Sequence, residues 1–164
     1  MAKRNICLAS AAMAVVFALL LVTGCGGTSG ANPKPSGSAD VSLVAPAEFA
    51  LADYAGKPVV LNFFGSWCAP CRMEAPALSE FAAAHPEVTV IAVAYNDDEE
   101  SAVAFLQEFS LSVPLVVDDY TVSSQLGVNA VPTTIFFTSD GKQATTIVGA
   151  STRERLEEGL AMAR

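Results

Sequence analysis

The sequence predicts an α/β fold for residues 41–164, with a central mixed sheet flanked by helices. Short apolar runs bounded by proline or glycine alternate along this part of the chain with longer amphipathic segments. Strands that are separated by helices pair in parallel, and this accounts for most of the sheet. Two later segments with strand-like composition flank Asp140-Gly141, a dipeptide typical of hairpin turns. They predict an antiparallel hairpin at one edge of the sheet.

The first half of this domain contains two buried strands and two helices. Residues 57–66, KPVVLNFFGS, are a short apolar run and predict a strand. Residues 69–86 predict a helix that is kinked at Pro76 and ends at a second proline. Residues 88–95 predict the next strand. Residues 96–110 begin with acids, which favour a solvated helix N-terminus, and continue as a helix.

The second half continues the alternation. A strand, a short helix, a hairpin and a C-terminal helix are predicted, in order, over residues 113–118, 121–128, 132–149 and 151–164. Ser151 or Thr152 is the expected cap of the last helix. A short lead-in element around residues 41–46 precedes the whole series.

The first 24 residues resemble an export signal. Lys3 and Arg4 precede an uncharged apolar run that ends in LVTGC, with Cys25 as its last residue. This arrangement resembles the bacterial lipoprotein box, whose cysteine carries a diacylglycerol after the signal is removed. Residues 1–24 are then a signal peptide, and residues 25–40, rich in Gly, Ser and Pro, are a lipidated flexible linker. The alternative is an uncleaved transmembrane helix, and either arrangement tethers the domain on the extracytoplasmic side of the membrane.

The charge of the chain excludes some partners. The formal net charge is −8 at pH 7, and loss of the two basic residues of the signal would make it more negative. An acidic domain lacks the basic surface that nucleic-acid binding requires. The same charge opposes adhesion to anionic lipid. We therefore expect no nucleic-acid partner and a membrane association through the lipid anchor.

The four cysteines differ in their expected fates. Cys7 lies in the removed signal and Cys25 is the lipidation site, so Cys68 and Cys71 are the only free thiols of the mature chain. Together with the single histidine, His85, they are too few for a structural zinc site, and we expect no metal and no cofactor. A disulfide across a two-residue loop restricts so little of the unfolded chain that it would stabilise the fold only weakly. A redox pair remains, and CxxC near a βαβ unit is typical of a thioredoxin-like fold.

The position of the pair predicts its chemistry. The motif follows a buried strand and begins a helix, whose unpaired N–H groups and partial positive charge favour a thiolate. We expect Cys68 to face solvent at the helix tip as the nucleophile, with Cys71 one turn further in as the resolving thiol. Pro70 restricts the intervening turn. Trp67 is expected to form an apolar lip beside the sulfur, where a client binds.

Three stretches, GKPVVLNFFGSWCAPCRMEAPAL, VIAVAYNDDEESAVAFL and GVNAVPTTIFFTSDGK, resemble the TlpA/ResA-type thiol-disulfide oxidoreductases of the thioredoxin superfamily. The resemblance runs from about Leu51 to Arg164. It implies a thioredoxin-like fold, a central mixed sheet flanked by helices, with a helix-strand insert. The acid-rich stretch after Tyr95 is expected to belong to this insert.

Further site residues follow from the resemblance. Pro132, in VPTT, matches the cis-proline that faces the cysteines, and a cis bond after Val131 would leave a backbone edge for a substrate strand. Glu74 matches the buried acid of the group, and its spacing of three from Cys71 places both on one helical face. A desolvated carboxyl there could exchange a proton with the Cys71 thiol. Asn62 replaces the buried aspartate of thioredoxin itself and cannot titrate.

These features predict a membrane-tethered thiol-disulfide oxidoreductase of the cell envelope. The resemblance implies a reductant of protein disulfides, with apocytochrome c cysteines as the archetypal client and a membrane thiol carrier as electron donor. One alternative is an oxidant or isomerase for secreted proteins. A second is a non-enzymatic binding lipoprotein in which His85 and the cysteine pair are ligands. A peroxidase is less favoured, because the two-residue spacing suits dithiol exchange better than attack on peroxide.

Two further residues are not expected to take part in the reaction. We expect His85 itself to be solvated or a helix C-cap, and Arg72 to be exposed.

Overall fold

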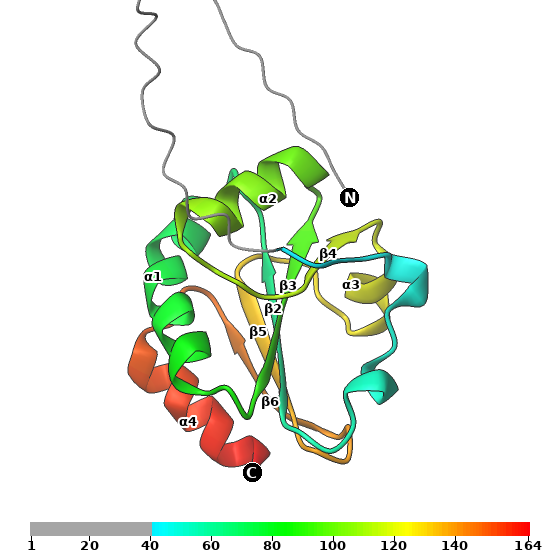
Figure 1. Ribbon diagram of the computed structural model, residues 1–164, viewed down its shortest axis with the longest axis vertical. Coiled ribbons are helices and arrows are strands. Elements are labelled where there is room, and N and C mark those ends of the chain that lie inside the picture. The colour runs from blue at the N-terminus through cyan, green and yellow to red at the C-terminus, as the bar shows by residue number, and fades with distance from the viewer. Residues whose placement is uncertain (1–40) are drawn as a thin grey trace, which may run out of the picture. The chain divides into compact units, whose positions relative to one another are not determined.

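The computed structural model describes residues 41–164, which contain one six-stranded sheet in the order β1-β4-β3-β2-β5-β6 (Figure 1). The strands are β1 (Leu43–Val44), β2 (Val59–Phe64), β3 (Thr89–Tyr95), β4 (Leu115–Asp118), β5 (Thr133–Phe137) and β6 (Gln143–Val148). The helices are α1 (Ala69–Ala84), α2 (Glu99–Glu108), α3 (Thr121–Gln125) and α4 (Arg153–Ala163), with 3-10 turns at Pro46–Glu48 and Leu51–Tyr54.

The sheet is mixed, as the sequence predicts. Strands β1, β4, β3 and β2 pair in parallel, whereas β5 is antiparallel to both β2 and β6. Every residue of β2 is buried, because this strand has neighbours on both sides and helices over both faces. The β5–β6 hairpin turns at Gly141, whose φ of 80° lies in the left-handed region that glycine adopts at little cost.

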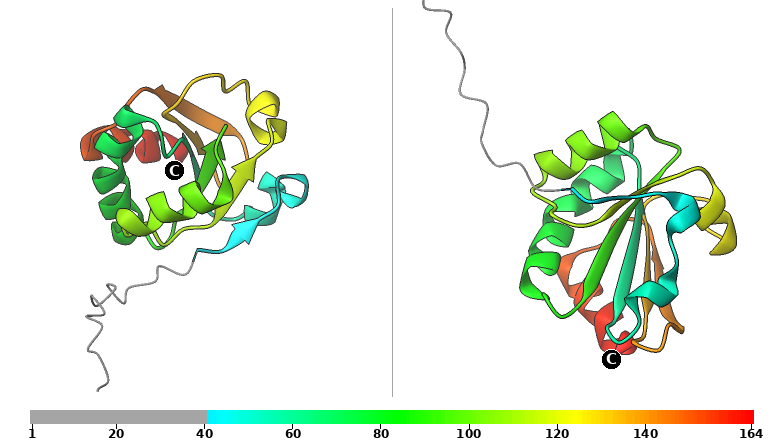
Figure 2. Two further views of the ribbon diagram at one scale, coloured as in Figure 1. Left: turned by 90° about the horizontal axis from the view of Figure 1, so that it is seen from above. Right: turned by 45° about the vertical axis from the view of Figure 1, so that its right-hand side comes forward.

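Two hydrophobic clusters lie on opposite faces of the sheet. Alternate residues of β2 divide between them: Val60 and Phe64 belong to the cluster under α1, α2 and α4, whereas Leu61 and Phe63 belong to the other. Helix α3 and the two 3-10 turns cover that second face (Figure 2). The arrangement is a three-layer α/β/α domain, so the predicted fold class is confirmed.

The boundaries of the elements follow the predicted signals. Cys68 caps α1, the chain leaves that helix at His85, and Asp98 and Thr152 cap α2 and α4 through hydrogen bonds from Ser101 N–H and Arg155 N–H. Helix α2 and strand β4 stand between β3 and α3, where the resemblance places the helix-strand insert. The predicted lead-in is the two-residue strand β1.

The expected signal peptide (residues 1–24) and the linker with the lipidation site Cys25 (residues 25–40) lie outside the described residues. Within residues 41–164, none of the helices combines the length and apolarity needed to cross a bilayer.

Candidate active site

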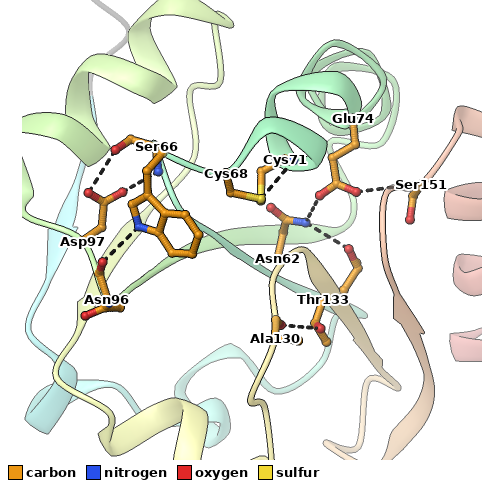
Figure 3. The surroundings of a disulfide bond; sticks show 12 residues. Asn62, Ser66, Cys68, Cys71, Glu74, Asn96, Asp97, Ala130, Thr133 and Ser151 are labelled. Atoms are coloured by element: carbon orange, nitrogen blue, oxygen red, sulfur yellow. Dashed lines mark hydrogen bonds between the residues drawn. A yellow bond between two sulfur atoms is a disulfide. The ribbon is translucent and has the colours of Figure 1, made fainter.

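A disulfide joins Cys68 and Cys71 at the start of α1, with the two Cα atoms 5.3 Å apart (Figure 3). Cys68 is the N-cap residue, and its sulfur accepts a hydrogen bond from the Cys71 N–H at 3.2 Å. Pro70, in the first helical turn, contributes no N–H of its own. The Cys68 sulfur therefore lies where the helix N-terminus stabilises negative charge, which favours its thiolate once the disulfide is reduced.

The expectation that Cys68 faces solvent is wrong for this oxidised form. Cys68 is only 4% exposed and Cys71 only 1% exposed, and both belong to the hydrophobic cluster under α1. The order of exposure is the predicted one, but packing against the cluster covers most of the first cysteine. By contrast, the neighbouring Trp67 is 58% exposed, and Pro70 is also exposed.

Glu74 lies one helical turn after Cys71 and is 3% exposed. Its carboxylate accepts two hydrogen bonds, from Asn62 Nδ2 to Oε1 at 2.8 Å and from the Ser151 N–H to Oε2 at 2.9 Å (Figure 3). Burial raises the pKa of Glu74 above its ordinary value of 4.5, while these two hydrogen bonds and the charge of Arg155 oppose the rise. The site thus holds a desolvated carboxyl on the same helical face as the inner cysteine.

Asn62 connects three elements around this carboxyl. Its Nδ2 also donates to Thr134 Oγ1 at 2.9 Å, and the β2–β5 register places Asn62 directly opposite Thr134. The amide therefore joins β2, α1 and β5. The sequence does not assign Thr134 or Ser151 to this site, because Thr134 becomes a neighbour only through the strand register and Ser151 contributes only its backbone N–H.

The Val131–Pro132 peptide bond is cis, as the resemblance implies. Antiparallel pairing of Phe63 with Thr133 places this segment at the end of the sheet where β2 leads into the cysteine loop. Pro132 is buried, and Val131 is half-buried against the hydrophobic clusters. The Pro132 carbonyl accepts a hydrogen bond from the Gly149 N–H at 2.9 Å.

The loop before Cys68 is held by a turn that sequence reasoning assigned only to a solvated helix cap. Trp67 Nε1 donates to the Asn96 carbonyl at 3.0 Å. Ser66 donates to the Asp97 carboxylate through its N–H at 2.5 Å and through its hydroxyl at 3.0 Å (Figure 3). These contacts join the β2–α1 and β3–α2 loops beside the disulfide.

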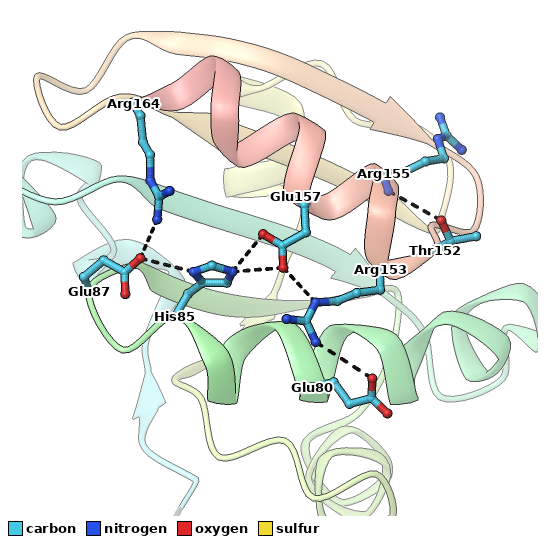
Figure 4. Close-up of polar contacts among 8 residues, drawn as sticks. All are labelled: Glu80, His85, Glu87, Thr152, Arg153, Arg155, Glu157 and Arg164. Atoms are coloured by element: carbon cyan, nitrogen blue, oxygen red, sulfur yellow. Dashed lines mark hydrogen bonds and ion pairs between the residues drawn. The ribbon is translucent and has the colours of Figure 1, made fainter.

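His85 lies at the other end of α1 (Figure 4). Its ring nitrogens face Glu87 Oε1 at 3.1 Å and Glu157 Oε2 at 2.9 Å, and these carboxylates raise the pKa of His85 above 6.5. Helix α1 is roughly 24 Å long at 1.5 Å per residue, so His85 cannot ligate one metal together with the cysteine pair. Residues 41–164 contain no group of three or more His, Cys, Asp or Glu side chains placed to hold a metal ion.

The Arg72 side chain is 40% exposed, in line with the expectation. It pairs with Glu108, and its guanidinium lies over the Phe109 ring, 5.2 Å from the ring centroid. Its charge is therefore directed toward α2, because the stacking contact and the carboxylate hold the side chain there.

The chain is similar to several known proteins. Residues 39–144 match the AhpC/TSA family. The chain is 34% identical over 116 residues to the thiol-disulfide oxidoreductase ResA of Geobacillus thermodenitrificans, an alignment that covers 69% of this chain and 67% of that protein.

Two solved structures from Mycobacterium tuberculosis are similar in fold and sequence. One is a secreted disulfide oxidoreductase homologous to Escherichia coli DsbE, with a TM-score of 0.63, 32% identity and coverage of 69% of this chain and 87% of that chain. The other is DsbF, with a TM-score of 0.64, 29% identity and coverage of 68% and 84%, respectively.

Proposed function

The chain belongs to the AhpC/TSA family and is a thiol-disulfide oxidoreductase, and from that premise we propose that it works outside the cytoplasm as a reductant of protein disulfides. The observation that carries the proposal is the redox pair at the N-terminus of α1 with a buried, hydrogen-bonded carboxyl one turn behind it. A helix N-terminus favours the attacking thiolate, and a buried carboxyl suits proton exchange with the inner thiol.

The reaction begins with both cysteines reduced. The Cys68 thiolate attacks one sulfur of the client disulfide, a mixed disulfide forms, and the second client sulfur leaves as a thiolate that takes up a proton. Cys71 then loses its proton and attacks the Cys68 sulfur, which releases the first client sulfur as a thiol. The client gains two electrons and two protons, and the protein ends with the Cys68–Cys71 disulfide seen in the structure.

Glu74 is the proposed acceptor of the Cys71 proton. Cys71 is 1% exposed, so water has little access to its sulfur, whereas Glu74 projects from the same helix one turn away. Asn62 and Ser151 hydrogen-bond to the two carboxylate oxygens and hold them in place. Since Asn62 cannot titrate, the carboxyl is the only ionisable group in this buried network of the described residues.

The client is proposed to bind across Trp67, Pro70 and Val131. Trp67 and Pro70 are next to the cysteines in the sequence and are exposed. The backbone at Val131 and Pro132 enters β5 at the same end of the sheet as Cys68. An extended client segment could add main-chain hydrogen bonds there while its disulfide approaches Cys68.

The location and partners rest on the sequence and on the relatives. The basic start, apolar run and LVTGC box support a cleaved signal and a lipid on Cys25, which would hold the domain at the outer face of the membrane. One similar protein is described as secreted. The oxidising compartment calls for a membrane thiol donor to regenerate the dithiol, and the CxxCH cysteines of apocytochrome c are the proposed clients.

The alternative is disulfide formation in secreted proteins. Thiol-disulfide exchange at the pair is reversible, so the direction depends on its reduction potential. The non-enzymatic binding protein is contradicted by the thiol-disulfide oxidoreductase assignment, and its ligand set is separated by the length of α1.

The test uses the full chain with Cys7→Ser and Cys25→Ser, so that Cys68 and Cys71 are the remaining thiols. The reduced protein is mixed with an oxidised CxxCH peptide, and peptide thiols are measured. We expect reduction by the parent chain, loss of reduction in Cys68→Ser, and a trapped mixed disulfide at Cys68 in Cys71→Ser. Reduction by the Cys68→Ser variant, or no trapped species, would contradict the assignment of roles.

A further inference from the structure

The two residues before Cys68 are held by two consecutive residues of a different loop. Ser66 donates its N–H and its hydroxyl to the Asp97 carboxylate, and the Trp67 indole N–H donates to the Asn96 carbonyl (Figure 3). Because Ser66 and Trp67 lead directly into the nucleophile, their positions fix where the Cys68 backbone begins the helix.

The turn that holds them is itself fixed. Asn96 has a φ of 50°, in the left-handed region that asparagine tolerates better than most residues. Its side-chain Oδ1 accepts a hydrogen bond from the Tyr120 hydroxyl at 2.8 Å, which ties the turn to the start of α3. On the other side, a Cβ at Gly65 would lie 2.6 Å from Trp67 Cε2, so only glycine allows the indole to lie this close to the loop backbone.

Helix capping does not explain Asp97. The adjacent Asp98 caps α2, since its carboxylate accepts the Ser101 N–H at 2.9 Å and the Ser101 hydroxyl at 2.8 Å. Among the ion pairs formed within residues 41–164, none includes Asp97. Its half-buried carboxylate is instead satisfied by Ser66 and by the Asp98 N–H at 3.0 Å.

Asp97 is the first of four consecutive acids, residues 97–100, in the turn into α2, and its carboxylate is the one that accepts hydrogen bonds from Ser66. Helix α1 carries Arg72, which is paired with Glu108 on α2, Glu74, which is bound to Asn62 and Ser151, and Glu80, which faces Arg153. The Ala130–Pro132 segment carries no charge. Asp97 is therefore the negative charge that hydrogen-bonds to the cysteine loop itself.

We propose that Asp97 is a positioning residue for thiol-disulfide exchange: through Ser66 it fixes the loop that presents Cys68 and keeps a negative charge at that loop. This inference rests on the proposed role of Cys68 as the nucleophile. A fixed loop favours in-line attack on a client disulfide, because a small misplacement of reacting atoms slows a reaction strongly. A nearby like charge disfavours the thiolate and so counteracts part of the helix N-terminus effect.

The test separates the charge of Asp97 from its hydrogen bonds to Ser66. Asp97→Asn removes the charge and keeps one oxygen that can accept the Ser66 N–H, while its NH₂ group can donate to the Ser66 hydroxyl; the bond from the Asp98 N–H is lost. Asp97→Ala removes the charge and all of these bonds. Asp98→Asn is the matched control, since it removes the same charge one residue away and retains a good helix cap. All variants are made in the full chain with Cys7→Ser and Cys25→Ser, and far-UV circular dichroism checks their fold.

Two rates are measured for each reduced variant as a function of pH: alkylation of Cys68 by iodoacetamide, located by fragment mass spectra, and reduction of an oxidised CxxCH peptide. In Asp97→Asn we expect alkylation about threefold faster below the Cys68 pKa, less than the effect of a charge in direct contact. We expect its peptide reduction at high pH, where the thiolate is fully formed, to match that of the parent. Asp97→Ala should lower that high-pH rate by about tenfold or more.

Identical alkylation profiles for Asp97→Asn and Asp98→Asn would overturn the charge assignment, and an unchanged high-pH rate in Asp97→Ala would overturn the positioning role. The parent chain is measured in the same assay. Absence of peptide reduction by the parent would count against the proposed function, whereas a difference confined to the Asp97 variants concerns this inference alone.

Discussion

Replacement of Glu74 by glutamine tests the proposed proton transfer at the buried end of the site. The carboxylate accepts one hydrogen bond on each oxygen, from Asn62 Nδ2 and from the Ser151 N–H. Glutamine offers one acceptor oxygen and one NH₂ group at the same place, so one of the two donors faces another donor. An unpaired buried donor costs about 1–3 kcal/mol, but the substitution also removes a buried charge, so the net loss of unfolding free energy near pH 7 should be below that range.

The kinetic effect should be confined to the second chemical step. Positioned acid–base groups contribute about 10²–10⁴-fold to a rate, so attack by Cys71 on the mixed disulfide should slow by a factor in that range in Glu74→Gln. Attack by Cys68 on the client should change little, because its thiolate is stabilised by the α1 N-terminus rather than by Glu74. The mixed disulfide should therefore accumulate.

Single-turnover quenched flow measures both steps, since acid quenching followed by thiol alkylation separates the mixed disulfide from the released client. Glu80→Gln, an exposed site on the same helix, is the control. If Glu74→Gln resolves its mixed disulfide within about threefold of the parent rate, Glu74 does not serve as the proton acceptor.

The pH dependence of the unfolding free energy tests the same carboxyl independently, and the direction of the change follows from its raised pKa. Burial raises the pKa of Glu74 above 4.5 in the folded protein, so the folded state holds this proton more tightly than the unfolded state. The corresponding stabilisation is present below pH 4.5 and is lost as the pH rises through the raised pKa. The unfolding free energy of the parent relative to Glu74→Gln should fall across that window. Resolution by the parent should slow as the pH falls through the same pKa.

Three further variants test other parts of the structure by urea unfolding. His85→Gln should cost about 1 kcal/mol at pH 6 and less at pH 9, because carboxylates raise the pKa of His85 and its ion-pair stabilisation is lost as the pH rises through that pKa; an equal cost at both values would refute the ion pairing. Gly159→Ala should cost about 1–3 kcal/mol, since the new Cβ would lie 2.5 Å from Phe136 Cε2, and a neutral effect would show that the ring can move aside. Asp98→Ala should lower the urea midpoint through loss of the α2 cap on Ser101, whereas an equal shift in Asp98→Asn would exclude capping as the cause.

The sequence predicts the helices and strands well where an apolar run coincides with a proline or glycine boundary. Strands β2 and β3 are continuous apolar runs because each is covered on both faces, and α1 ends beside Pro86, which cannot continue the helix. The position of the CxxC pair at a strand-helix junction follows directly from these boundaries. Its capping geometry could thus be anticipated from local sequence.

The contacts that complete the site could not be predicted in the same way. Ser66 and Asp97 are 31 residues apart, and their contact depends on the conformation of two loops rather than on periodicity. Ser151 contributes a backbone N–H, which every residue except proline possesses, so its side chain gives no signal. The burial of Cys68 cannot be predicted from local sequence, because exposure at a helix tip depends on how the preceding loop packs.

The reduction potential of the Cys68–Cys71 couple distinguishes a reductant of protein disulfides from an oxidant. It is measured in the full chain with Cys7→Ser and Cys25→Ser, equilibrated against glutathione and dithiothreitol buffers. We expect a value at or below the thioredoxin end of the range, about −270 mV, as a reductant fed by a membrane carrier requires. A value near about −120 mV would contradict it and assign the protein to disulfide formation.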